Sequence, residues 1–316
     1  MSGLHRIKTL GSLVPWIPSV VQGQYKLYTD RRGVLLVRLM GGLGNQMFQY
    51  ATAANLARTT GRNIYVDISY LCDRNRDSTF IARDYQLDLF RHESPLVYVP
   101  KDKSIVVSDN QFSFADGVTI NQIDIDSIVN QIKRCTSPVM LNGYWQSTQS
   151  VGERDQVVEL FRFNPNLSTD AQNLLAKIQA DESVMVNVRR TDFLTNNVNG
   201  IVGLDYYSKA FEHITYLYPS ARFYIFSDDV DWCREQFCGQ NEFVVGHEYS
   251  GDRFSTYLYL MKSCKHFVIP NSTFAWWAAY LGYSKESIVT RPKLFMPGIG
   301  HEHDELFDGL DWTIID

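Results

Sequence analysis

The sequence is poor in the residues and patterns that mark disulfide-stabilised and metal-binding proteins. Its five cysteines are an odd number with scattered spacing, and they form neither a disulfide framework nor a CxxC pair. Its seven histidines give no ligand pattern, because His301 and His303 lie in an acidic segment that is typical of a solvated loop. We therefore expect reduced thiols and no metal site.

The sequence also lacks an excess of basic residues and a long hydrophobic run. The net charge of -5 gives no support for a nucleic-acid partner, which usually leaves a basic surface. No segment reaches the roughly 18 continuous apolar residues of a membrane-spanning helix. The closest run, residues 10–21, is interrupted by Pro15 and Pro18 and has no small-residue cleavage site of the signal-peptide kind. These absences predict a cytoplasmic protein.

Residues 1–33 differ from the rest of the chain in their charge. The apolar run is surrounded by five basic residues: Arg6, Lys8, Lys26, Arg31 and Arg32. We expect this basic N-terminal tail to be poorly ordered or to make a weak peripheral contact with an anionic membrane surface.

The remaining sequence is that of an ordinary globular chain. With 316 residues, 45% of them hydrophobic and 21% charged, it is long enough for two domains. An apolar run at 34–39, a glycine-rich turn, a helical pattern at 47–60 and a strand pattern at 63–68 predict a βαβ unit. Residues 70–150 follow no sustained period and receive no detailed assignment.

The second half of the chain alternates strand and helix patterns more clearly. Strands are expected at residues 184–188, 222–226, 242–245, 266–269 and 287–290. Helices are expected between them, at residues 205–218, 230–237, 255–263 and 274–281. This alternation predicts a parallel sheet with helices on both faces. We place the domains at 1–33 for the basic tail, 34–165 for an N-terminal Rossmann-like domain and 166–316 for a C-terminal one.

Two arginines and a carboxylate, Arg189, Arg190 and Asp192, follow directly after the expected strand at 184–188. The carboxyl ends of parallel strands are where open α/β sheets bind ligands. Guanidinium groups donate planar pairs of hydrogen bonds to phosphate oxygens. A phosphorylated or nucleotide-linked substrate is therefore one interpretation, and a structural ion pair that caps the strand is the other.

Two later strand ends also carry polar groups. Asp228 and Asp229 end one of them, and a carboxylate there is able to accept two hydrogen bonds from the N1–H and amino groups of guanine. Asn271, Ser272 and Thr273 open a helix, where hydroxyls and free backbone N–H groups suit a diphosphate. Helix capping is the alternative interpretation of both segments.

The glycine-rich turn near the N-terminus gives weaker evidence. Gly42 and Gly44 permit close approach of a backbone, and Asn45 and Gln46 supply donors and acceptors for sugar hydroxyls or a phosphate. The spacing matches neither the GxGxxG fingerprint nor a P-loop. On its own this turn identifies no ligand.

Taken in order, these segments resemble the motifs of the α-1,2-fucosyltransferases of glycosyltransferase family 11. The motifs are GGLGNQMFQYA at 41–51, GYWQS at 143–147, NVRRTD at 187–192, FSDD at 226–229 and NSTFAWWAAYL at 271–281. They run in the family order between residues 34 and 290, and their joint occurrence is specific.

The resemblance implies an α/β fold of the GT-B-like type, with two facing Rossmann-like domains that contain parallel sheets. It implies an inverting enzyme that transfers L-fucose from GDP-fucose to the 2-hydroxyl of a galactose-containing acceptor glycan. GDP-fucose is then a donor substrate, bound by the C-terminal domain, and the acceptor lies on the side of the N-terminal domain. No cofactor and no metal ion are expected.

For such an enzyme we hypothesise the following roles for the strand-end residues. Arg189 and Arg190 hold the diphosphate, and Asp228 or Asp229 reads guanine. The hydroxyls at the start of the last helix complete the diphosphate cradle. Because charge builds on the departing GDP, preorganised guanidinium groups are the expected catalytic device. Asp192 is the first candidate for the base that takes the acceptor proton.

Two features leave alternatives open. Asn187 stands where the family usually has His, and an amide forms hydrogen bonds but does not titrate. We therefore expect the arginines, rather than residue 187, to carry the catalytic role. The replacement also leaves open a non-catalytic nucleotide-sugar or glycan-binding protein. A transferase for another GDP-sugar is a further alternative. Asp67, at the end of a strand in the N-terminal domain, is the second candidate for the base.

Overall fold

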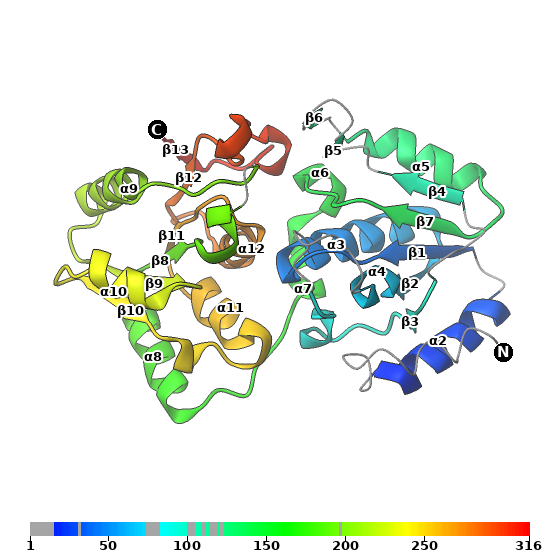
Figure 1. The fold of residues 1–316 in the computed structure, drawn as a ribbon, viewed down its shortest axis with the longest axis horizontal. Helices are drawn as coiled ribbons and strands as arrows, with labels where there is room; N and C mark the ends of the chain where they lie inside the picture. Colours follow the sequence, from blue (N-terminus) through cyan, green and yellow to red (C-terminus); the bar gives the residue numbers. More distant parts are fainter. Residues whose placement is uncertain are drawn as a thin grey trace. The chain divides into compact units, whose positions relative to one another are not determined.

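The computed structural model describes residues 16–30, 33–73, 83–99, 105–108, 112–113, 119–120, 123–195 and 198–316. The chain divides into two units, residues 1–162 and residues 163–316. Each unit is an α/β structure built around its own sheet (Figure 1). The sequence predicted the domain boundary between residues 165 and 166, three residues after the boundary between the two units.

Unit 1 is built on a five-stranded sheet in the order β3-β2-β1-β7-β4, in which every neighbouring pair is parallel. The strands are β1 (Val34–Arg38), β2 (Asn63–Asp67), β3 (Leu96–Val97), β4 (Ile105–Ser108) and β7 (Val139–Asn142). A separate antiparallel pair is formed by β5 (Phe112–Ser113) and β6 (Thr119–Ile120). The expected βαβ unit is present, since β1 pairs with β2 and a helix connects them.

The helices of unit 1 are α2 (Ile17–Thr29), α3 (Leu43–Thr60), α4 (Ser69–Cys72), α5 (Ile125–Arg134), α6 (Thr148–Val151) and α7 (Arg154–Leu160), with a 3-10 turn η2 (Leu87–Leu89). Helix α3 starts within the glycine-rich turn, four residues earlier than expected. It ends at Gly61, which adopts the left-handed conformation (φ 69°) that favours glycine at this position.

The expectation of a poorly ordered tail is wrong for residues 17–29, which form helix α2. Pro18 lies in the first turn, where its missing N–H is not needed, so this proline begins the helix rather than breaking it. The helix packs closely on β3: a Cβ atom on Gly23 would lie 1.9 Å from the Leu96 carbonyl oxygen. Gln24 Nε2 donates to the Tyr98 carbonyl at 2.7 Å. Among the described residues, no helix is long and apolar enough to cross a membrane.

Unit 2 contains a six-stranded sheet in the order β10-β9-β8-β11-β12-β13, again with every neighbouring pair parallel. The strands are β8 (Glu182–Val188), β9 (Ala221–Ser227), β10 (Glu242–Val245), β11 (His266–Val268), β12 (Val289–Pro292) and β13 (Thr313–Ile315). The α/β class with two parallel sheets is therefore confirmed.

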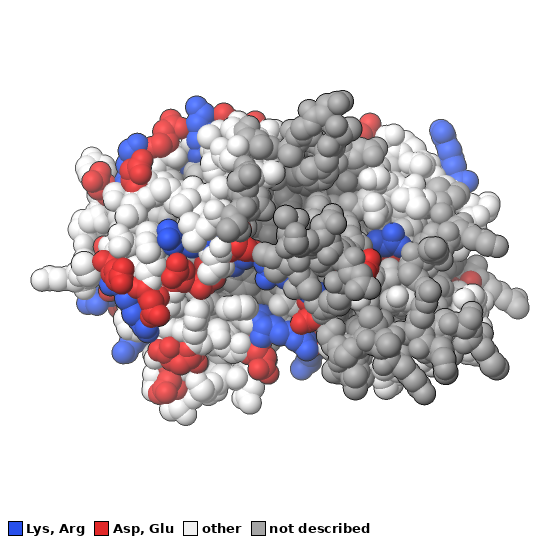
Figure 2. Space-filling model, in the orientation of Figure 1, with Lys and Arg blue, Asp and Glu red and all other residues white. Residues whose placement is uncertain are grey.

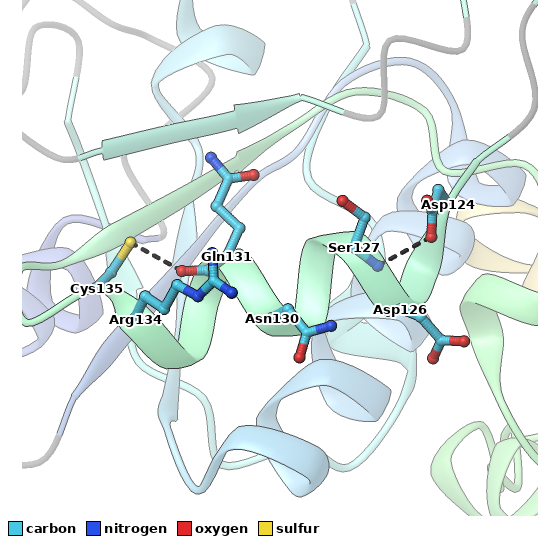
Figure 3. A pocket seen from close by; sticks show the side chains of 7 residues that line it. All are labelled: Asp124, Asp126, Ser127, Asn130, Gln131, Arg134 and Cys135. Atoms are coloured by element: carbon cyan, nitrogen blue, oxygen red, sulfur yellow. Dashed lines mark hydrogen bonds between the residues drawn. The ribbon is translucent and has the colours of Figure 1, made fainter.

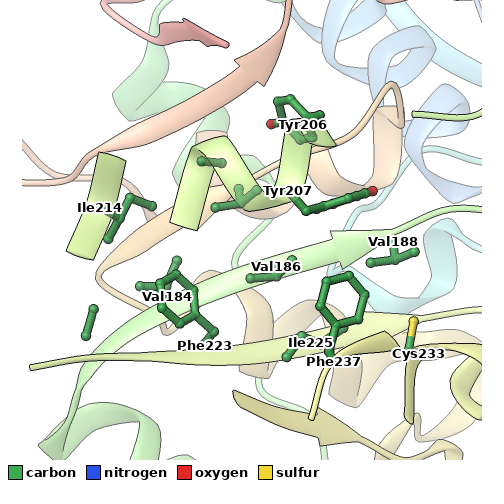
Figure 4. Close-up of a cluster of buried hydrophobic side chains, with 13 residues drawn as sticks. Val184, Val186, Val188, Tyr206, Tyr207, Ile214, Phe223, Ile225, Cys233 and Phe237 are labelled. Carbon is green, nitrogen blue, oxygen red and sulfur yellow. The ribbon is translucent and has the colours of Figure 1, made fainter. Parts of the chain in front are cut away.

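The helices of unit 2 are α8 (Thr169–Ala180), α9 (Leu204–Leu217), α10 (Val230–Gln236), α11 (Ser255–Lys262) and α12 (Thr273–Gly282). In the described part of unit 2, the 3-10 turns η3 (Thr191–Thr195), η4 (His247–Tyr249) and η5 (Asp252–Phe254) lie between these helices, and η6 (Pro297–Ile299) and η7 (Asp304–Leu306) follow α12. Figure 4 shows the core in which side chains of β8 and β9 meet the inner face of α9. Strands β8 and β9 pair in parallel up to Val188 and Ser227, so their carboxyl ends lie next to each other.

Candidate active site

The carboxyl ends of β8 and β9 bring the predicted arginines and aspartates together. The two strands are parallel and pair residue by residue, with Val188 opposite Ser227. The residues that follow therefore leave the sheet at the same edge. This register explains why side chains that are 39 positions apart in the chain form one cluster.

Both arginines form ion pairs in this cluster. Arg189 Nη1 lies 2.9 Å from Asp228 Oδ2, and the same guanidinium pairs with Asp192. Arg190 Nε lies 3.1 Å from Asp229 Oδ2. The arginine side chains remain 25% and 17% exposed. The structural ion pair is thus present, and part of each arginine side chain stays accessible to solvent.

Further contacts hold Arg190 and Asp228 in position. The backbone N–H of Arg190 donates to Asp228 Oδ1 at 3.0 Å, and the Thr191 hydroxyl donates to Asp228 Oδ2. The guanidinium carbon of Arg190 lies 3.8 Å from the centroid of the Trp232 ring, in a cation–π contact. Asp228 at the end of β9 therefore contacts both Arg189 and Arg190 at the end of β8. Sequence reasoning missed Trp232, although an aromatic residue one turn into a helix at a strand end was a usable signal.

Asp229 has the capping role that sequence reasoning kept as an alternative. Its Oδ1 accepts from the Trp232 backbone N–H at 3.4 Å at the start of α10. Its own N–H donates to Ser227 Oγ at 2.9 Å. The expected contact of either aspartate with guanine stays a prediction.

Asn187 is buried at the end of β8 and is directed toward β9. Its side-chain Nδ2 donates to the Phe226 carbonyl at 3.0 Å, and its backbone carbonyl accepts from the Tyr207 hydroxyl at 3.1 Å. Only 7% of this residue is exposed. The side-chain amide is thus held beside the arginines by its bond to the Phe226 carbonyl, and its contact with substrate stays a prediction.

Asn271, Ser272 and Thr273 lie at the end of β11, the strand next to β8 on its other side. Ser272 is the N-cap of α12, and its Oγ accepts from the Ala275 N–H at 3.5 Å. Asn271 Nδ2 donates to the Gly200 carbonyl at 3.3 Å, and its Oδ1 is buried without a hydrogen-bond partner among the described residues. The strand order thus gathers all three predicted segments at one edge of unit 2.

The aromatic pair that follows is part of the core. Trp276 and Trp277 are fully buried, and Trp276 Nε1 donates to the Leu306 carbonyl at 3.0 Å. The core interpretation of these tryptophans therefore agrees with the structure.

The glycine-rich turn of unit 1 divides into an open part and a structural part. Gly42 is the N-cap of α3, and a Cβ atom there would meet nothing within 4 Å. Asn45 is partly buried, and its Oδ1 accepts from Gln146 Nε2 at 3.0 Å. Gly44 and Gln46 are buried. Gly42 and Asn45 are thus partly exposed, while Gly44 and Gln46 are not.

Gln46 has no exposed atoms. Its Nε2 donates to the carbonyls of Gly41 at 2.9 Å and Asp84 at 2.8 Å, and its Oε1 accepts from the Gln86 N–H at 3.0 Å. The side chain therefore joins the first turn of α3 to the segment before η2. This is a structural role rather than the expected ligand contact.

Asp67, the second candidate for the base, is also a structural residue. It is fully buried, and its carboxylate accepts hydrogen bonds from Arg38 Nε at 2.9 Å, Val99 N at 2.9 Å and both the N–H and hydroxyl of Ser69. Burial raises the pKa of Asp67, while the bonds from Ser69, Arg38 and Val99 oppose that rise. A carboxylate with four donors and no exposure does not reach a substrate proton. The sequence analysis did not single out Arg38 as the partner of Asp67. Its position as the one charged residue in the apolar run at 34–39 was a usable signal.

A surface hollow elsewhere in unit 1 is unrelated to these residues. Figure 3 shows it along α5, with a volume of about 730 Å³. Its lining residues are Asp124, Asp126, Ser127, Asn130, Gln131, Arg134 and Cys135. It contains no predicted site residue, so we do not assign the activity to it.

Charge and metal-ligand patterns add little to the site. Figure 2 shows acidic and basic side chains intermixed over the face of unit 2 in view, unlike the basic footprint of a nucleic-acid-binding surface. In the part of the chain that the structure describes, no group of three or more His, Cys, Asp or Glu is arranged to hold a metal ion.

Comparisons with known proteins indicate which family the chain is similar to. Residues 80–296 match the model of Glycosyl transferase family 11. The chain is 29% identical over 287 residues to the O-antigen biosynthesis glycosyltransferase WbnK of Escherichia coli, covering 82% of this chain and 94% of the relative. It is 26% identical to an alpha-1,2-colitosyltransferase of Escherichia coli, covering 78% of this chain and 87% of the relative.

A mammalian relative and a solved structure extend the comparison. The galactoside 2-alpha-L-fucosyltransferase Sec1 of Mus musculus is 28% identical, covering 88% of this chain and 72% of the relative. The crystal structure of POFUT1 in complex with GDP-fucose aligns with a TM-score of 0.51 at 13% identity, covering 83% of this chain and 99% of that chain. This likeness concerns the fold, and with it the GT-B-like class is confirmed.

Proposed function

The chain belongs to glycosyl transferase family 11, and we propose that it is an inverting enzyme that transfers L-fucose from GDP-fucose to the 2-hydroxyl of a galactoside. The observation that carries the proposal is the arginine and aspartate cluster at the carboxyl ends of β8 and β9. The names of the relatives support an α-1,2 linkage and a deoxysugar.

The arginines bind the diphosphate and stabilise the charge that develops on it. A guanidinium has five N–H donors. Arg190 uses Nε for Asp229, so its two Nη groups are left to reach phosphate oxygens. Because Asp228 and Trp232 already fix the arginines, little reorganisation is needed when the bond to GDP breaks. Each charged hydrogen bond contributes on the order of 1.5 to 3 kcal/mol.

The cluster also suggests how a base becomes available. It contains two guanidiniums and three carboxylates, and Asp192 pairs with Arg189. When the diphosphate arrives, Arg189 exchanges Asp192 for a phosphate oxygen. The released carboxylate then accepts the proton of the galactose hydroxyl as that oxygen attacks the anomeric carbon from the face opposite GDP. This order gives inversion at the anomeric carbon and couples the base to donor binding.

The remaining predicted contacts complete the substrate site. Ser272 and Thr273 support the diphosphate at the start of α12, Asp228 or Asp229 recognises guanine, and Asn271 and Asn187 line the same edge. For unit 1 taken by itself, we propose that the partly exposed residues of the turn, Gly42 and Asn45, bind the acceptor. The chemistry in this scheme uses no cofactor and no metal ion.

Release of GDP from GDP-fucose that depends on a galactoside acceptor tests the proposal. An enzyme releases GDP in proportion to the acceptor, whereas a nucleotide-sugar-binding protein without turnover releases none. Analysis of the product for an α-1,2 linkage checks the regiochemistry.

A second candidate is transfer of another GDP-linked deoxysugar. The name of the Escherichia coli alpha-1,2-colitosyltransferase favours it. Competition between GDP-fucose, other GDP-sugars and GDP for the same site distinguishes the two, because the true donor gives the highest kcat/KM.

We also propose that the protein is cytoplasmic and that its N-terminal segment contacts an anionic membrane surface. No acidic residue precedes Asp30, and Tyr25 and Tyr28 expose their rings on the outer side of α2. Basic residues combined with aromatic rings suit the headgroup region. Sedimentation with vesicles that contain phosphatidylserine, compared with pure phosphatidylcholine, tests this. Equal binding to both would remove the electrostatic contact.

A further inference from the structure

The loop that follows β10 extends the carboxyl edge of unit 2 beyond Asp228. Strand β10 neighbours β9, so its carboxyl end lies beside the end that carries Ser227 and Asp228. The two ends are also in contact, because His247 Nε2 lies 3.1 Å from the Ser227 carbonyl oxygen. A ligand whose phosphates lie at β8 and whose base reaches β9 therefore extends toward this loop.

The loop has a strained backbone at two consecutive residues. Arg253 (φ 52°, ψ 34°) and Phe254 (φ 61°, ψ 22°) both adopt the left-handed conformation. Two adjacent residues with side chains rarely do so, and such strain persists only where the surroundings impose it. Strain of this kind is concentrated at ligand-binding sites.

Three hydrogen bonds tie the two ends of the loop together. The N–H groups of Thr256 and Tyr257 both donate to the Ser250 carbonyl, at 3.1 and 3.2 Å. The Tyr257 hydroxyl donates to the Val245 carbonyl at 2.8 Å. The start of α11 is thereby tied to the end of β10, on either side of the strained residues.

The strain presents an aromatic ring at the surface. Phe254 is 45% exposed. Its ring centroid lies 6.0 Å from that of buried Tyr257, which in turn lies 5.3 Å from that of Phe226, the residue before Ser227. One face of the loop thus packs toward the β9 end, while the Phe254 ring keeps a surface open to a ligand.

We propose that Phe254 stacks on the nucleobase of the donor, an inference that rests on the proposed function. Every base has a π-face, so stacking supplies affinity with little choice between bases. The carboxylates at the end of β9 then make the site selective for guanine. Phe254 is a binding residue in this scheme and takes no part in the bond that breaks.

Calorimetric titration of GDP onto four proteins tests the inference: the natural chain, Phe254→Ala, Phe254→Trp and Phe243→Ala. Phe243 on β10 is an equally exposed phenylalanine (46%) with an unstrained backbone, so it controls for the loss of a surface ring. We expect Kd to rise roughly tenfold or more for Phe254→Ala, to stay within about twofold for Phe243→Ala, and to be restored by Phe254→Trp. Pyrophosphate has no base and should bind all four alike.

The outcomes separate this inference from the function on which it rests. If the natural chain binds GDP and Phe254→Ala binds it equally well, the stacking role is wrong and the function stands. If Phe254→Ala weakens pyrophosphate as much as GDP, the change acts on the whole site and the inference is again wrong. If the natural chain binds no GDP, both fail.

Discussion

Replacement of Arg189 by Ala distinguishes a catalytic guanidinium from a purely structural ion pair. The side chain makes two ion pairs, to Asp228 and Asp192, and is only 25% exposed. Its loss leaves two shielded carboxylates near each other without their cation. For partly buried charged bonds we expect a loss of about 1.5 to 3 kcal/mol in the free energy of unfolding. For a unit of this size, that corresponds to a fall in Tm of roughly 4 to 10 °C.

The catalytic role predicts a second, separate loss. If Arg189 meets the charge on the departing GDP, the variant should lose roughly a hundredfold in turnover, which corresponds to about 2.7 kcal/mol in the transition state. Both quantities are measured on the same sample: Tm by calorimetry, and kcat from GDP release at a temperature where the variant is fully folded. Normalising turnover to folded protein keeps the two effects apart.

A matched control comes from the other end of the same sheet. Arg222 Nε lies 3.6 Å from Asp181 Oδ2, and its side chain is 57% exposed. An exposed pair of this kind contributes at most about 1 kcal/mol, so Arg222→Ala should change neither Tm nor kcat appreciably. If Arg189→Ala lowers Tm but keeps turnover within threefold of the natural chain, the reasoning on phosphate stabilisation is refuted.

Three further predictions concern the base, metal ions and acid stability. Asp192→Asn should lower kcat while GDP still binds, and near-normal turnover would remove Asp192 as the base. EDTA should leave activity intact, because the guanidiniums carry the role that a divalent cation plays elsewhere; strict dependence on Mn²⁺ or Mg²⁺ would contradict this. Burial acts to raise the pKa of Glu182, but hydrogen bonds from His266 and Lys265 outweigh it and hold that pKa below its usual value. Ionised Glu182 therefore contributes to the free energy of unfolding above about pH 4.5, and this contribution is lost as the pH falls through the lowered pKa. Glu182→Gln should be less stable than the natural chain at neutral pH. The difference between the two proteins, measured by urea unfolding, should shrink below pH 4.

The order of elements along the chain follows from local patterns. An apolar run such as 184–188 is buried on both faces of a parallel sheet, and the helices between such runs carry one apolar face. These signals depend on neighbouring residues only, and they located β8 to β12 and α9 to α12 within a few positions. Helix α7 and strand β13 received no prediction in advance, because short elements give weak periodic signals. Helix α5 was also not predicted, although Ile128 and Ile132 stand at helical spacing and are both buried, which was a usable signal.

The position of α2 shows where local reasoning failed. Pro15 and Pro18 indicated that the apolar run at 10–21 is interrupted. In the structure, Pro18 lies in the first turn of a helix. What stabilises α2 is contact with β3, about 70 residues away, at the close approach of Gly23 to Leu96. No pattern within residues 1–33 contains that information.

The sequence by itself determined that polar residues end the strands, that two arginines stand at one of these ends, and that the chain resembles a nucleotide-sugar-dependent family. The tertiary structure decided what those residues contact. The register of β8 against β9 pairs Arg189 and Arg190 with Asp228 and Asp229, and burial turns Gln46 into a structural residue. The physical reason is that residue type and strand position are local properties. The partner of a charge, and whether water still reaches it, depend on segments tens of residues away that meet only in the folded sheet.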